Sequence, residues 1–291
     1  MMNFKNGIEL LRLCQANQLP ISEIMKIREC ALAETTESEL ITRMKKVLEI
    51  MKHSAKTPIA HPHPSIGGLI GGEAQLVNEH RLTGKSLCGP LFSKAICYSL
   101  AVLESNSSMG LIVAAPTAGS SGVVPGVVLS LQEEYDLSDD ALLPALFNAS
   151  AIGYLAMRNA TVSGAVGGCQ AEVGIASAMA ASAAVEIMGG TPKQCLDSAS
   201  IALMNLLGLV CDPVGGLVEC PCQIRNTIGA TNALTAAELV LSGVKQMIPF
   251  DEMLETMYNI GRRMAPEFRE TAKGGCAAAP SVCAACATPI L

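Results

Sequence analysis

The sequence predicts an all-α fold: a single compact domain over residues 1–291, built from Ala-rich helices with functional Gly/Pro loops at their ends. Half of the residues are apolar, 16% are charged and 3% are aromatic. Such a core must be filled by small and aliphatic side chains, which suit packed helices better than sheets, where aromatic and β-branched residues are favoured. A chain of 291 residues can bury a sizeable core.

The N-terminal residues 1–55 predict an outer helical layer. Apolar residues recur at helical spacing in the segment 37–55, where Leu40, Met44 and Met51 share one face. The next segment, TPIAHPHPSIGGLIGGEA, is rich in Pro and Gly and is expected to be a loop. Helical spacing resumes in GPLFSKAICYSLAVLES, which begins at residue 89.

The rest of the chain predicts buried helices joined by loops. Residues 110–126, GLIVAAPTAGSSGVVPG, are a short apolar run followed by a Gly/Ser turn that opens a helix. Thr191 and Gln194 form a predicted capping box, with Pro192 at the first helical position. The tail, 271–291, predicts a flexible Cys-rich segment. The helices expected in this half are 138–160, 171–188, 191–208, 223–243 and 249–264.

Charge and composition argue against several classes of protein. The net charge of −6 and the lack of a basic cluster with interleaved aromatics argue against a nucleic-acid binder. The uncharged stretch 105–132 contains prolines, glycines and many hydroxyl residues, which a lipid-facing helix seldom tolerates. The N-terminus lacks the pattern of a secretory signal, so we expect a cytoplasmic protein. In that compartment the twelve cysteines are expected to be buried thiols or metal ligands rather than disulfides.

Three cysteines lie at predicted helix ends. Cys211 is followed by Asp-Pro and Gly-Gly, which should end one helix, whereas Cys169 and one of Cys220 or Cys222 each precede another. Helix ends can converge, and the N–H groups at helix starts stabilise thiolates. Three thiolates would leave one metal position open, whereas a structural zinc or a saturated iron–sulfur cluster takes four. The spacing alone leaves buried structural thiols as an equal alternative, because it contains no C-x-x-C pair among these three.

Five blocks of sequence resemble the signature sequences of the α chain of iron–sulfur-dependent bacterial L-serine dehydratases, a family of L-serine ammonia-lyases. The resemblance covers about residues 80–275, with a compatible helical N-terminus. The blocks are TGKSLCGP (83–90), APTAGSSGVVPG (115–126), NATVSGAVGGCQAEVG (159–174), LGLVCDPVGGLVECPCQIRN (207–226) and FRETAKGG (268–275).

The resemblance implies a [4Fe–4S] cluster held by Cys169, Cys211 and Cys222, with Cys220 as a spare thiol. In some members of the family a terminal cysteine folds back onto the fourth iron. This chain ends differently from the common pattern, and the candidates for that part, with incidental thiols as the alternative, are Cys276, Cys283 and Cys286.

The resemblance also implies an activity, the deamination of L-serine to pyruvate and ammonia. An iron with an open position would bind the departing hydroxyl group while a base takes the Cα proton. Lyases acting on L-cysteine or L-threonine, and a non-catalytic metal or thiol scaffold, remain alternatives. The family's β portion is missing from this chain, so we expect a β-chain partner, a homo-oligomer or both.

The candidate bases come from two loops. His61 and His63 each precede a proline, and in an extended segment they would point the same way. Lys85 is the third candidate, either as the base or as an anchor for the substrate carboxylate. The alternatives are an exposed Pro-rich loop and a surface lysine.

The candidate substrate-binding residues surround a hydroxyl-rich turn and the first cysteine loop. A turn that opens a helix offers backbone N–H groups to a carboxylate, although simple helix capping uses the same residues. Glu172 is a further candidate for contacting the amino group or a sulfur. Arg225 and Asn226 are candidates for orienting the cysteine loop, with simple helix capping as the alternative. The substrate candidates are Thr117, Gly119, Ser120, Ser121, Asn159 and Ser163.

Overall fold

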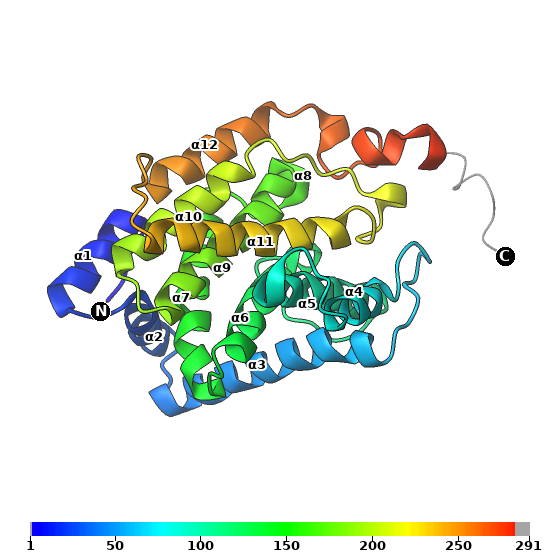
Figure 1. Cartoon of the computed structure of the whole chain (residues 1–291). Helices are drawn as coiled ribbons and strands as arrows, with labels where there is room; N and C mark the ends of the chain where they lie inside the picture. The colour runs from blue at the N-terminus through cyan, green and yellow to red at the C-terminus, as the bar shows by residue number, and fades with distance from the viewer. Residues whose placement is uncertain (1, 283–291) are drawn as a thin grey trace.

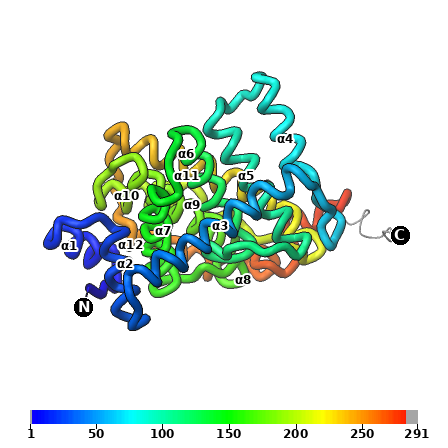
Figure 2. The backbone as a smooth tube through the Cα atoms, turned by 90° about the horizontal axis from the view of Figure 1, so that it is seen from below, coloured from blue at the N-terminus to red at the C-terminus, as the bar shows by residue number. Residues whose placement is uncertain are grey.

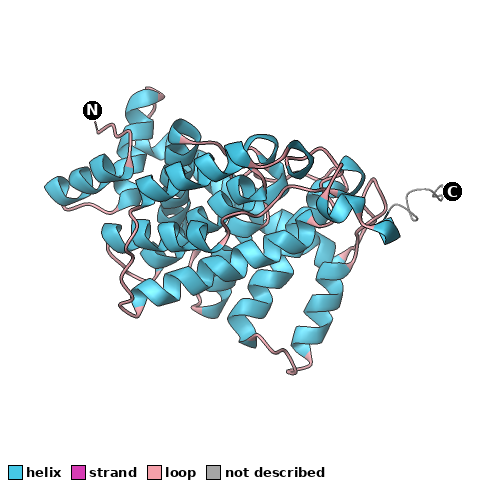
Figure 3. Cartoon of the chain, turned by 90° about the horizontal axis from the view of Figure 1, so that it is seen from above, coloured by secondary structure: helices cyan, strands magenta, loops and turns pink. Residues whose placement is uncertain are grey.

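The computed structural model describes residues 2–282, and within this range the secondary structure is helical, with no strand (Figures 1 and 3). This confirms the all-α prediction. The helices are α1 (Gly7–Asn17), α2 (Ile21–Leu32), α3 (Glu37–Ala60), α4 (Glu73–Leu82), α5 (Gly89–Ser107), η1 (Ala118–Ser120), α6 (Val123–Glu134), α7 (Asp139–Asn159), α8 (Gly164–Gly167), α9 (Cys169–Ile187), α10 (Pro192–Asn205), η2 (Val214–Gly216), α11 (Cys222–Leu241), α12 (Phe250–Arg263), η3 (Pro266–Phe268) and η4 (Gly275–Ala278).

Helix α9 forms the centre of the bundle. It packs against α7, α10, α11 and α6, and its residues are buried along almost the whole length. Most of these residues are Ala, Ser or Gly, which let neighbouring backbones approach closely. The buried hydroxyl of Ser177 donates to the carbonyl of Gly229 on α11, 2.8 Å away, so the polar group is satisfied inside the core. One hydrophobic core extends from Phe4 to Met257 on α12.

The N-terminal helices α1, α2 and α3 pack around the outside of the bundle. Helix α2 packs on α7, and α3 packs on α5 (Figure 2). Helix α3 continues to Ala60, so the loop predicted from residue 57 begins only at residue 61. Pro58 removes the hydrogen bond that the Ser54 carbonyl would accept in a regular helix. The hydroxyl of Ser105 on α5 donates to that carbonyl instead, at 2.8 Å, which explains why the helix tolerates the proline.

Helices α4 and α5 form a hairpin whose turn, residues 83–88, projects from the body of the bundle (Figure 2). Leu87 at its tip is fully exposed.

Most of the other predicted helices are found within three residues of their expected ends. The capping box of Thr191 and Gln194 is present. One helix in the described range, α7, is long and apolar enough to cross a membrane, and 67% of its apolar window is buried inside the protein. Cys169 and Cys222 are the first residues of α9 and α11, so the two cysteines start these helices rather than precede them.

Candidate metal centre

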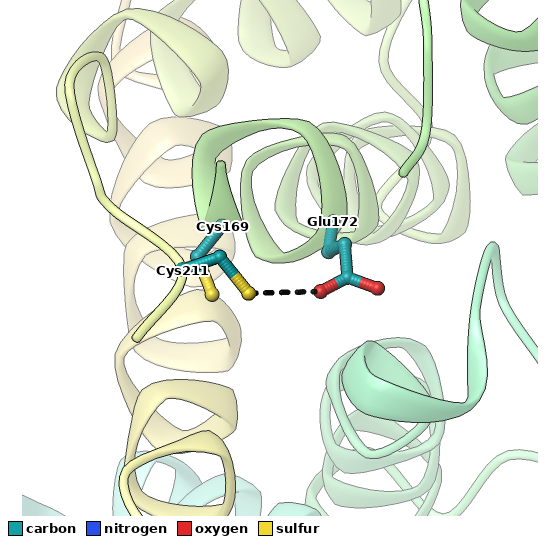
Figure 4. Close-up of side chains that lie close together, drawn as sticks. All are labelled: Cys169, Glu172 and Cys211. Atoms are coloured by element: carbon teal, nitrogen blue, oxygen red, sulfur yellow. Dashed lines mark hydrogen bonds between the residues drawn. The ribbon is translucent and has the colours of Figure 1, made fainter. Parts of the chain in front are cut away.

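Two thiols and a carboxylate meet at the start of α9. The sulfurs of Cys169 and Cys211 and a carboxylate oxygen of Glu172 all lie within 4.8 Å of one another (Figure 4). Cys169 and Glu172 stand one turn apart on α9, whereas Cys211 comes from the segment that follows α10. The Cys211 sulfur lies 3.9 Å from Glu172 Oε2. Within residues 2–282, these three side chains form the one group whose ligand atoms lie close enough together to share an ion.

Backbone contacts fix the position of Cys211. Its N–H donates to the carbonyl of Phe268 at 2.8 Å, and its carbonyl accepts from the N–H of Glu270 at 2.7 Å. These bonds form an isolated parallel bridge between Cys211 and Arg269. The C-terminal segment therefore holds the second cysteine in place. On the other side, the N–H of Gln170 donates to Leu209 and ties this segment to the first turn of α9.

A glycine keeps the space beside the sulfur open. A Cβ atom on Gly164 would lie 2.9 Å from the Cys211 sulfur and 2.7 Å from Glu172 Oε2. Gly168, with φ +76°, allows a close approach to the Leu209 carbonyl, since a Cβ there would lie 2.8 Å from its oxygen. The two thiols and the carboxylate therefore border a space that larger residues would fill.

The hydroxyl-rich turn lies directly against this group. Thr117 Oγ1 donates to Glu172 Oε1 at 2.9 Å and lies 3.0 Å from Ser120 Oγ. The side chain of Asn226 on α11 holds the turn in place. It accepts a hydrogen bond from the N–H of Gly122 at 3.0 Å and donates one to the carbonyl of Gly119 at 2.8 Å. Ser121 is buried and caps its own turn through the Ala118 carbonyl. The structure thus brings four of the predicted substrate residues to the cysteine group.

Cys222 lies outside the 4.8 Å group but acts electrostatically on the same space. It is buried at the start of α11. Burial, followed by the charges of Cys169 and Glu172, raises the pKa of Cys222 to about 12. The hydrogen bond with Cys169, followed by burial, raises the pKa of Cys211.

The pKa of the Glu172 carboxyl group is also raised. Burial raises the pKa of Glu172 to about 7, although the hydrogen bond from Thr117 opposes the rise. Acidic groups whose pKa values are raised by burial and by one another favour a bound cation, because a metal ion stabilises their charged forms. The donor set of buried thiols with one carboxylate therefore fits a metal or an iron–sulfur cluster.

Two acidic residues near the centre were missed by the sequence analysis. The charge of Glu270 contributes to the raised pKa values of Glu172, Cys211 and Cys222. Asp212 is 2% exposed, and its Oδ2 accepts from the N–H of Cys276 at 2.6 Å. Both could have been singled out, because Asp212 directly follows Cys211 and Glu270 lies in the FRETAKGG block.

A buried carboxylate joins the Pro- and Gly-rich loop to the cysteine loop. Glu219 accepts hydrogen bonds from Ser65 Oγ, the N–H of Gly67 and the N–H of Leu69, at 2.7–3.0 Å. His61 and His63 are exposed and line a separate cavity of about 220 Å³ together with His53. No cluster cysteine lines that cavity.

The remaining predicted site residues lie on other elements. Lys85 is exposed on the projecting α4–α5 turn. The side chain of Asn159, at the end of α7, donates to the carbonyl of Lys5 at 2.8 Å. Ser163 precedes α8, and its carbonyl accepts from the N–H of Gly167. The structure does not bring Asn159 into the cysteine group, and it places Ser163 next to Gly164.

The structure describes the C-terminal segment as far as residue 282. Residues 275–278 form the short helix η4, which is held by Asp212 through the N–H of Cys276. The Cys276 residue is exposed. Cys283 and Cys286 lie outside the described residues.

Comparisons with known proteins identify the family. A family model described as serine dehydratase alpha chain matches residues 16–277. The chain is 44% identical to the probable L-serine dehydratase alpha chain of Bacillus subtilis, covering 96% of this chain and 92% of that protein. It is 40% identical to the L-serine dehydratase alpha chain of Peptoniphilus asaccharolyticus, covering 92% of both. It is also 37% identical to an L-serine dehydratase of Helicobacter pylori, of which it covers 61%. These matches extend over most of the chain and include every block of the candidate site, so this chain belongs to the serine dehydratase alpha chain family.

Proposed function

We propose that this chain is the α subunit of an iron–sulfur-dependent L-serine dehydratase, which converts L-serine to pyruvate and ammonia. The observation that carries the proposal is the meeting of Cys169, Cys211 and Glu172 beside the turn that begins at Thr117. The names of the relatives support the substrate, and the buried thiols support the metal.

Cys169, Cys211 and Cys222 would hold a [4Fe–4S] cluster. Cys222 is buried, and its thiol interacts electrostatically with Cys169 and Glu172, which supports its place as the third ligand. When bound with one iron lacking a cysteine, the cluster supplies a Lewis acid for the departing hydroxyl group. The glycine at 164 leaves room on the side where Glu172 lies.

The residues of this chain would bind and orient the substrate. The N–H groups of the turn at residues 117–121 are proposed to bind the substrate carboxylate, because this turn directly precedes the start of α6. The Glu172 carboxylate, held by Thr117, would pair with the ammonium group. Asn226 keeps the turn in register with α11 and therefore with Cys222.

For the base that takes the Cα proton we retain Lys85, His61 and His63 as candidates. Each lies on a loop that a second chain can reach, because all three are exposed. Loss of kcat in one of the single variants Lys85→Met, His61→Asn and His63→Asn, with iron content unchanged, would identify the base. Unchanged kcat in all three variants would exclude them.

We also propose a β-chain partner and a reducing cytoplasm as the setting. The alpha-chain relatives are covered at 92% of their length, whereas the Helicobacter pylori protein, named L-serine dehydratase without a chain designation, is covered at 61%. The additional part of such longer relatives is the proposed counterpart of a separate β chain. Exposed iron is oxygen-labile, which supports a reducing compartment.

Anaerobic reconstitution with iron and sulfide tests the proposed function. We expect an absorption band at about 400 nm, which zinc does not give, and pyruvate formation from L-serine once the β chain is present. L-cysteine and L-threonine serve as competing substrates in the same assay. A chain that takes up zinc but neither iron nor sulfide would contradict the proposal.

A further inference from the structure

The side chain of Arg225 contacts the two segments that carry Cys169 and Cys211, and Arg225 itself belongs to the segment that carries Cys222. It lies three residues after Cys222, in the first part of α11. Its Nη1 atom lies 3.7 Å from the sulfur of Cys169, at the start of α9. The same atom donates to the carbonyl of Val210 at 2.8 Å and to Asp212 Oδ1 at 2.5 Å, on either side of Cys211.

The ion pair between Arg225 and Asp212 is largely buried. The side chain of Arg225 is 13% exposed and that of Asp212 is 2% exposed. A buried cation needs compensating partners, and here they are one carboxylate, one carbonyl and one sulfur. An arginine that only capped α11 would not need to reach across to α9.

Asp212 extends the connection to the C-terminal segment. Its Oδ1 faces Arg225, and its Oδ2 accepts from the N–H of Cys276. Gly275 adopts φ +61°, and a Cβ atom there would lie 2.1 Å from Asp212 Oδ2. The backbone is therefore packed directly against the carboxylate, so the ion pair has little freedom to move.

From these contacts we infer that Arg225 is a positioning residue that fixes the three cysteine segments relative to one another and raises the reduction potential of the cluster by placing a positive charge at Cys169. The inference rests on the proposed function, because it needs a cluster at this site. Hydrogen bonds to cluster sulfurs and nearby net charge are established determinants of cluster potential. Residues that orient ligands also control how tightly the metal is held.

The two members of the ion pair allow the charge effect to be separated from a structural one. Arg225→Gln removes the positive charge, and Asp212→Asn removes the negative charge with little change in shape. If the pair serves only the fold, both variants lower the unfolding temperature and neither moves the potential. If Arg225 acts on the cluster, the potential falls in Arg225→Gln and rises in Asp212→Asn.

The test uses the anaerobically reconstituted chain, or its complex with the β chain. The potential is measured by a redox titration followed by electron paramagnetic resonance, and iron loss is followed with a chelator. We expect opposite shifts in the two single variants, a potential near the wild-type value in the double variant, and about tenfold faster iron loss in Arg225→Gln. Arg225→Lys should retain most of the wild-type potential, and Arg263→Gln, which removes an exposed charge from α12, should change neither quantity.

Potentials that move in the same direction, or do not move, would overturn the inference. If Arg225→Gln does not fold, the double variant, which leaves no unpaired buried charge, is compared with Asp212→Asn: a lower potential in the double variant supports the role of Arg225, and an equal potential contradicts it. A wild-type chain that takes up no iron and sulfide contradicts the proposed function itself. A normal wild-type cluster with unmoved potentials contradicts only the role of Arg225.

Discussion

Glu172 Oε2 lies 3.9 Å from the sulfur of Cys211, although 39 residues separate the two in the chain. Because Cys169 precedes Glu172 by one helical turn, this contact joins the start of α9 to the segment after α10. The third side of the group is the turn at Thr117, whose hydroxyl donates to the same carboxylate. The sulfurs of the two cysteines and the hydroxyl of Thr117 thus lie around the carboxylate of Glu172.

Glu172→Gln is expected to weaken substrate binding while leaving the metal in place. Gln keeps the shape and can accept the hydrogen bond from Thr117, but it has no charge to pair with the substrate ammonium group. A hydrogen bond to a charged group contributes about 1.5–3 kcal/mol, so we expect kcat/KM for L-serine to fall about tenfold or more.

Steady-state kinetics with iron counting check this prediction. Glu252→Gln, on the exposed face of α12, is the matched control and should behave as the wild type. An unchanged kcat/KM in Glu172→Gln would show that the carboxylate does not contact the substrate.

The pH dependence of stability is expected to depend on Glu104. Burial raises the pKa of this carboxyl to about 7, and the neighbouring Glu73 adds to the rise. The folded chain therefore holds this proton more tightly than the unfolded chain. The resulting stability is present below pH 4.5 and is lost as the pH rises through about 7.

Glu104→Gln mimics the protonated carboxyl and can keep the contacts with the Ala74 N–H and Gln223. At pH 8 we expect the variant to be more stable than the wild type by on the order of 1–2 kcal/mol, with a much smaller difference at pH 5. Urea unfolding at both pH values measures this, with exposed Glu79→Gln as the control. The same difference at both pH values would contradict the assignment.

Gly275→Ala is expected to release the C-terminal segment from Asp212. The new Cβ would overlap the carboxylate, and φ at this position is +61°. Local opening should make trypsin cleavage after the exposed Lys273 about tenfold faster, since about 1.4 kcal/mol corresponds to that factor.

Gly189→Ala provides the control for this experiment. Gly189 has φ +78° but no atom within 4 Å of the added Cβ, so it carries the backbone strain without the clash. Equal cleavage rates at Lys273 in Gly275→Ala and in the wild type would mean that Asp212 does not hold the segment.

The sequence predicted the helices well because their signals are local. The capping box at Thr191 and the amphipathic pattern of 249–264 need no tertiary information. The predicted end of the helix before Pro58 was wrong, because a tertiary contact decides it. Ser105, on another helix and 51 residues away, donates a hydrogen bond to the Ser54 carbonyl, and this lets Pro58 remain inside α3.

The same distinction applies to the site. Helix ends and family blocks pointed to Cys169 and Cys211, and the structure brings these two together. The roles of Asp212, Glu270 and Arg225 depend on which segments cross near the cysteines, and no local pattern encodes that crossing. Asn159 was placed near the site by its position in a block, whereas its side chain turns to the N-terminal segment.

The central claim is that Cys169, Cys211 and Cys222 hold one cluster. The most direct measurement is the iron content of the anaerobically reconstituted chain, together with its absorption at about 400 nm, in the wild type and in Cys211→Ala. Cys195→Ala, which removes a buried thiol from α10, is the control for lost packing. We expect iron and absorption to be lost in Cys211→Ala and kept in Cys195→Ala. Full iron content and an unchanged spectrum in Cys211→Ala would contradict the account.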